Sequence, residues 1–184
     1  SDLTTGVPGS TKDARALFYG LNRSLDITDV SAFTQGYSVT KFSNLRADGQ
    51  SAKDAGFVDM DFPLFRLAEA SLNYAEAVLR GGAMVGGYTA LSAINALRVR
   101  AEAAQLTTVD LQTVLDEKAR EFFFVVQRRT DLIRFGKFAG STDYNWDWKG
   151  GTPGGIPFAI HRNLFPIPQS EIQNNPNLVQ NVGY

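Results

Sequence analysis

Apolar residues recur at helical spacing through the middle of the chain, and these repeats predict its helices. A first helix is expected over 63–80, because a proline opens this stretch and a pair of glycines closes it. A second helix is expected over 88–104, after a glycine-rich loop. Both helices carry alanine at close-packing positions, namely Ala68, Ala75, Ala90 and Ala93. This pattern is typical of a tetratricopeptide-like helical hairpin, which needs neighbouring helices to bury its faces.

The third predicted helix spans 108–129 and is the longest of the three. It starts as an amphipathic helix and ends in a run of apolar residues, 122–126. Because this run is apolar on every side of a helix, that end is expected to be fully buried. A short helix or turn should follow over 131–138 and end at Gly136. The segment 63–138 is therefore the predicted helical part.

Short strands and irregular structure are predicted on both sides of this helical part. Residues 1–60 should form loops and two short strands, over 15–21 and 36–45. Residues 139–184 should form an irregular loop and an ordered tail, in which prolines exclude regular structure and apolar residues pin the chain across a surface. The predicted fold class is therefore mainly α: a tetratricopeptide-like helical hairpin plus a long third helix, with short β segments and a long irregular C-terminal region.

Composition narrows the function classes. The 184 residues are 43% hydrophobic and 20% charged, with a formal net charge of −1, which suits a globular domain. No basic stripe is visible, which argues against a nucleic-acid partner, and the longest apolar run is far too short to span a bilayer. There is no cysteine, His161 is the single histidine, and nucleotide-binding and nucleophile-elbow motifs are missing. Neither a metal site nor a cofactor is therefore expected.

The third helix and the residues after it carry a set of charges that invites two interpretations: Glu117, Arg120, Glu121, Arg128, Asp131 and Arg134. Paired carboxylates act as acid and base in glycosidases. Arginine–carboxylate pairs, however, commonly satisfy one another where an apolar helix end is buried. We therefore interpret this set as structural ion pairs. Polar residues of the first two helices are interpreted in the same way, as caps and inter-helix hydrogen bonds: Glu69, Asn73, Glu76, Asn95 and Arg98.

The segment 141–151 (STDYNWDWKGG) is the candidate binding site. Its aromatic and polar residues, which include both tryptophans of the chain, are Tyr144, Asn145, Trp146, Asp147 and Trp148. Strict alternation would place the aromatic residues on one side of the segment, and Lys149 with the asparagine and aspartate on the other. Aromatic faces stack on the C–H faces of sugars, while amide and carboxylate groups bind hydroxyls. The alternative is that these rings only hold a long loop over the core.

Several stretches of the chain contain distinctive sequence motifs. The tail, 165–184, reads FPIPQSEIQNNPNLVQNVGY, and 66–77 reads RLAEASLNYAEA. Together with Asn95, Arg98 and the charged set above, these motifs resemble the SusD/RagB family, outer-membrane nutrient-binding lipoproteins of Bacteroidetes. The chain departs from the family pattern at two places. Val182 stands where the family usually has proline, and Val125–Val126 replace a frequent Glu-Gly pair.

The resemblance implies a function for the whole protein. This chain would be a C-terminal SusD/RagB-like domain, 1–184, and the N-terminal part with its signal and lipid anchor would lie outside it. The family captures oligosaccharides or other nutrients at the cell surface and delivers them to a SusC-like TonB-dependent transporter in the outer membrane. A surface-exposed lipoprotein that binds glycans and is not an enzyme is therefore expected, with membrane contact only through its anchor.

Two alternatives remain open. A tetratricopeptide-type protein-interaction module would bind protein segments and no sugar. A glycoside hydrolase would need two carboxylates roughly 5–10 Å apart in one cleft, for example among Asp143, Asp147 and Glu171. Nothing in the sequence favours the hydrolase.

Overall fold

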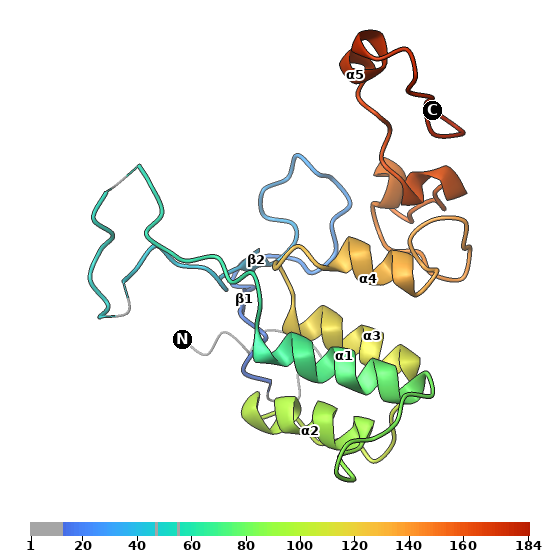
Figure 1. Cartoon of the computed structure of the whole chain (residues 1–184). Coiled ribbons are helices and arrows are strands. Elements are labelled where there is room, and N and C mark those ends of the chain that lie inside the picture. The colour runs from blue at the N-terminus through green and yellow to red at the C-terminus, as the bar shows by residue number, and fades with distance from the viewer. Residues whose placement is uncertain (1–12, 47, 55) are drawn as a thin grey trace. The chain divides into compact units, whose positions relative to one another are not determined.

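The computed structural model describes residues 13–46, 48–54 and 56–184. The chain divides into two compact units at the bond between Val126 and Gln127. In chain order the elements are β1 (Phe18–Tyr19), β2 (Ser38–Val39), α1 (Leu67–Leu79), α2 (Ala90–Arg100), α3 (Leu111–Glu121), α4 (Arg128–Arg134), the 3₁₀ helices η1 (Lys149–Gly151) and η2 (Ile160–Asn163), and α5 (Gln169–Asn174) (Figure 1). The predicted class, mainly α with short β segments, is confirmed.

The first unit is built around α1, which packs against both α2 and α3 (Figure 1). The alanines predicted at close-packing positions are all buried, at 4% exposure or less. The remaining core side chains of these helices are Leu72, Ile94, Leu97, Val114 and Leu115. Small residues at the contact let two helix backbones approach closely, so the helical period and the alanines together account for the hairpin of α1 and α2.

Side-chain caps fix the starts of two of these helices. The hydroxyl of Thr89 accepts a hydrogen bond from the Ser92 backbone N–H at 3.0 Å, before α2. The carboxylate of Asp110 accepts one from the Thr113 N–H at 2.7 Å, before α3. Each cap satisfies a backbone donor that has no partner inside the helix. Both helices therefore begin later than their apolar period alone predicts.

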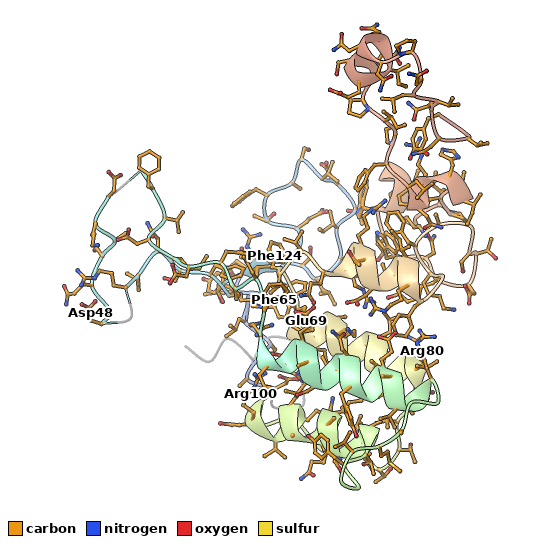
Figure 2. All side chains as sticks on the ribbon, in the orientation of Figure 1. Asp48, Phe65, Glu69, Arg80, Arg100 and Phe124 are labelled. Carbon is orange, nitrogen blue, oxygen red and sulfur yellow. The ribbon has the colours of Figure 1, made fainter. Side chains whose placement is uncertain are left out.

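The two strands are much shorter than predicted. Phe18 pairs with Val39 and Tyr19 with Ser38 in an antiparallel two-stranded sheet. Between β2 and α1 the chain makes a long excursion, with Asp48 near its far end (Figure 2). Only one isolated bridge, between Leu45 and Ser51, is recorded in the described part of this excursion.

The first two predicted helices are confirmed in position and wrong at their ends. The chain before Leu67 is extended at Arg66, so Pro63 lies outside α1. Two apolar residues within the predicted range 63–80, Leu64 and Leu67, are 75% and 83% exposed. At the other end, α2 stops at Arg100 because Glu102 takes a left-handed conformation with φ of 55°.

The prediction of a long third helix is wrong. α3 has 11 residues, fewer than the 13 of α1, and ends at Glu121. Beyond it Phe124 and Val126 have φ of 60° and 64°, values that no right-handed helix contains. The apolar run is consequently only half buried: Phe122 and Val125 are 5% exposed, whereas Phe124 and Val126 are 60% and 83% exposed.

The second unit starts with α4, whose end at Gly136 is confirmed by a φ of 68° at that glycine. The tail contains the short helix α5, which was not predicted, and Pro168 stands immediately before it, where a proline costs no hydrogen bond. Across the described residues, no helix is long and apolar enough to cross a bilayer.

Hydrogen bonds hold the tail in place. The side-chain amide of Gln180 bonds both to the N–H of Ile167 at 2.8 Å and to its carbonyl at 2.9 Å. The hydroxyl of Tyr184 donates to the Leu164 carbonyl at 2.8 Å. The structure has the ordered tail that was predicted, but not all of its apolar residues are pinned to a surface: Phe165 and Val179 are 71% and 83% exposed.

Candidate functional site

The candidate loop 141–151 lies in the second unit, where its rings join an aromatic cluster. Trp146 is stacked on Phe138 at a centroid distance of 6.2 Å and meets Phe158 edge-on at 6.2 Å. Tyr144 contacts Trp146 edge-on at 6.3 Å. Offset and edge-to-face pairs of this kind are favourable beyond their buried area. Trp146 is therefore the centre of a small core.

Lys149 completes this core. Its side chain is 1% exposed, and its ammonium lies 4.4 Å from the Trp146 ring centroid and 5.2 Å from that of Phe158. The ammonium also donates a hydrogen bond to the Tyr144 carbonyl at 3.3 Å. Burial lowers the pKa of Lys149 below its ordinary value, because the charged form loses its hydration. The aromatic rings offset part of that loss through cation–π attraction.

The predicted alternation holds only as far as Trp146. Trp148 has a left-handed φ of 65°, and the turn at this residue brings Lys149 back to the rings, on the side from which alternation would exclude it. The side chain of Trp148 itself is half-buried. The glycines that follow it, Gly150 and Gly151, also have positive φ, as their turn-forming role predicts.

The polar residues of the loop differ in whether their side chains already make hydrogen bonds within the protein. The Asn145 amide donates to the Gly154 carbonyl at 3.0 Å and thus holds the loop. The Tyr144 hydroxyl accepts a hydrogen bond from Arg128. Asp147 is exposed and has no recorded partner in the described part of the chain. Asp147 is thus open to a ligand, and the ring of Trp148 beside it is half-buried, as are those of Tyr144 and Trp146.

The other two carboxylates considered for glycoside hydrolysis, Asp143 and Glu171, lack the environment of a catalytic acid. Asp143 accepts hydrogen bonds from Lys137 and Ser141, and these lower its pKa. A general acid needs the opposite, a raised pKa. Glu171 is exposed in the first turn of α5.

Three members of the predicted charged set, Glu117, Arg120 and Glu121, belong to one ion-pair cluster in the first unit. Glu117, fully buried, binds Arg15 at 2.7 Å, Arg98 at 2.8 Å and Arg120 at 3.0 Å. Glu121, 3% exposed, lies beside it on α3. Its arginine partners are Arg100 at 2.5 Å, Arg66 at 3.1 Å and Arg15 at 3.2 Å.

The electrostatics of Glu121 support the structural interpretation. Burial alone would raise the pKa of this carboxyl, but the hydrogen bond and charge of Arg100, with those of Arg15 and Arg66, outweigh burial and lower it. Glu121 therefore stays ionised, with both of its carboxylate oxygens paired to arginines. Asp131, in the second unit, likewise pairs with Arg134 at 2.6 Å.

The polar residues predicted to act as caps and inter-helix hydrogen bonds do so only in part. Asn95 bonds the backbone of Leu106 with both ends of its amide, at 2.8 and 2.9 Å. The Asn73 amide oxygen accepts from Lys118 at 2.7 Å, which joins α1 to α3. Glu76 pairs with Arg80 at 3.0 Å within one turn of α1.

Sequence reasoning missed several members of both clusters. Phe138, Phe158 and Lys149 surround Trp146, and only their aromatic or cationic type near the loop could have pointed to them. The ion-pair partners Arg15, Arg66 and Arg100 come from distant parts of the chain, so no local spacing shows them. His161 packs edge-on against Tyr184 at 4.8 Å, and no group of metal-binding side chains occurs among the described residues.

Comparison with known proteins gives a consistent result. The model of the SusD family matches residues 15–184. The starch-binding protein SusD of Bacteroides thetaiotaomicron is 45% identical over 177 residues, which is 94% of this chain and 31% of that protein. The chain thus spans about a third of the length of this relative.

Solved structures share the fold. Surface glycan-binding protein A from Bacteroides uniformis has a TM-score of 0.61 at 26% identity, over 94% of this chain and 38% of that one. A SusD superfamily protein from Parabacteroides distasonis has a TM-score of 0.67 at 24% identity, over 95% of this chain and 40% of that one.

Proposed function

The chain belongs to the SusD family, and from this membership we propose that it is part of a cell-surface protein that captures oligosaccharides. The observation that carries the proposal is the 45% identity, over 94% of the chain, to a protein named for binding starch. Oligosaccharides of the starch type are therefore the proposed ligands.

Within this chain the proposed contact is the loop that contains Asp147 and Trp148. The exposed carboxylate can accept hydrogen bonds from sugar hydroxyls, and the neighbouring ring can stack on a C–H face. Tyr144 and Trp146 support the loop from the aromatic cluster, and Asn145 ties it to Gly154. Alternation predicted the carboxylate and the ring for opposite sides of the segment; in this proposal the clustered rings of Tyr144 and Trp146 position the loop, and Asp147 and Trp148 bind the sugar.

The proposed protein works as a carrier and breaks no bond. Captured oligosaccharides pass to a SusC-like TonB-dependent transporter, and a lipid anchor outside this chain holds the protein at the outer-membrane surface. Family membership supports both steps. The lowered pKa values of Asp143 and Glu121 also fit binding better than glycoside hydrolysis, which needs a protonated carboxyl at neutral pH.

Calorimetric titration with a malto-oligosaccharide tests the proposal. Trp148→Ala and Asp147→Ala should each weaken binding about tenfold, which is the loss expected for one well-placed contact. Trp146→Ala should mainly lower stability, because its ring contacts Phe138 and Phe158.

Phe33→Ala is the matched control, since this ring is 87% exposed and belongs to the first unit. It should bind as the wild type does. Unchanged affinity in folded Trp148→Ala and Asp147→Ala would remove the loop from the binding site. A complete lack of binding by the wild-type chain would refute glycan capture by this part of the protein.

A further inference from the structure

A pocket of about 350 Å³ opens beside the ion-pair cluster of the first unit. Its walls come from the segment before β1, from the approach to α1, and from the ends of α2 and α3. Figure 2 labels Arg100, one of its walls, at the C-terminal end of α2. The volume lies at the lower end of the range of ligand pockets, roughly 300–1,000 Å³.

The walls of this pocket are strongly cationic. Glu121 is the one carboxylate among the residues that line it. The lining also includes five basic side chains: Arg15, Lys41, Arg66, Arg100 and Arg120. The carboxylates in the cluster are already engaged, Glu121 by three arginines and Glu117 by three. Positive charge therefore exceeds negative charge at the pocket wall.

Two of these arginines keep unused donors. Arg100 and Arg120 are about half exposed, with side-chain exposures of 53% and 48%, and each makes one ion pair through a single nitrogen. A guanidinium carries several N–H groups in a fixed fork that matches carboxylate and phosphate oxygens. The remaining N–H groups of both side chains are free to bind an oxyanion.

Two further groups indicate the same chemistry. The Nε of Arg66 is buried and has no hydrogen-bond partner among the described residues, which is costly for a charged donor. The ammonium of Lys41 donates to the Phe123 carbonyl at 2.7 Å, and no carboxylate in the described part of the chain is bonded to it. Burial and the charge of Arg66 lower the pKa of Lys41, as expected where cations outnumber anions.

We propose that this pocket binds a small oxyanion of the phosphate or carboxylate type, held between the forks of Arg100 and Arg120. This inference is independent of glycan capture, because the pocket and the loop 141–151 lie in different units. The bound anion would neutralise the excess positive charge and stabilise the junction of α2 and α3 with the segment before β1.

Calorimetric titration of the 184-residue chain with inorganic phosphate, against sodium chloride at equal ionic strength, tests the proposal. Saturable binding of one phosphate is expected. The double variant Arg100→Gln/Arg120→Gln should weaken it by at least about tenfold, since both forks are lost. A parallel titration with succinate shows whether carboxylate or phosphate is preferred, and binding of either supports the pocket.

The matched control is Arg46→Gln/Lys53→Gln, which removes two exposed cations of the same unit that do not line the pocket. It should bind phosphate as the wild type does. Circular dichroism checks folding, and Arg120→Gln alone serves if the double variant does not fold. No saturable binding beyond chloride, or equal losses in pocket and control variants, would overturn the proposal.

Discussion

The ammonium of Lys149 lies against the rings of Trp146 and Phe158, and no carboxylate of residues 13–46, 48–54 and 56–184 is paired with it. Sequence alternation predicted that Lys149 lies on the side away from the rings. A left-handed turn at Trp148 could not be predicted from the sequence, because most residues with positive φ are glycine, asparagine or aspartate. The left-handed turn at Trp148 thus brings the lysine to the rings. Two residues of the predicted binding face, Tyr144 and Trp146, become half-buried members of an aromatic cluster.

Replacing Lys149 by methionine should leave the free energy of unfolding at neutral pH unchanged or raise it by about 1 kcal/mol, since methionine fills similar space without a buried charge. Wild-type stability should rise as pH increases from the lowered pKa of Lys149 towards the ordinary value of 10.5. Over this window the unfolded chain binds more protons than the folded chain. Lys149→Met should lack this part of the rise in urea unfolding.

Lys53→Met, at an exposed lysine, is the control and should keep the alkaline rise. A loss of several kcal/mol in Lys149→Met at neutral pH would instead show that the ammonium itself stabilises the aromatic cluster.

Among the elements, the end of α3 departs most from its sequence pattern. The run 122–126 carries no glycine, proline or asparagine that would predict a stop, and its apolar residues favour continuation. Burial of Phe122 and Val125 on one side of an irregular turn prevailed over helical propensity. By contrast, the centres of α1 and α2 follow from their period and alanines, which pack locally.

Val126→Gly should stabilise the protein by about 1 kcal/mol. A β-branched residue is strained at φ of 64°, glycine is not, and the exposed Val126 side chain gives up little packing. The family resemblance is consistent with this, because a glycine is frequent at this position. Chemical denaturation measures the change.

Val99→Gly is the comparison, because this exposed valine lies inside α2, where glycine weakens a helix. The two variants should change stability in opposite directions. A loss of stability in both would show that the left-handed turn at Val126 carries no strain.

For the whole molecule, the sequence predicted the fold class, the family and the structural role of the charged set. It did not predict the cationic pocket, because the charged residues around it are distant in the chain: Arg15 and Glu117 meet at 2.7 Å. It did not predict the aromatic cluster either, because the left-handed turn at Trp148 breaks the alternation of the loop. Since the chain spans about a third of its starch-binding relative, glycan capture by this part is the claim that most needs a direct test.

Both tryptophans of the chain, Trp146 and Trp148, lie in the proposed contact loop, so their fluorescence reports on that loop alone. The measurement is a titration of the chain with a malto-oligosaccharide while tryptophan emission is recorded. A saturable shift of the emission to shorter wavelength is expected as a sugar covers Trp148, with the same midpoint as calorimetric binding. Calorimetric saturation without any change in emission would contradict this expectation.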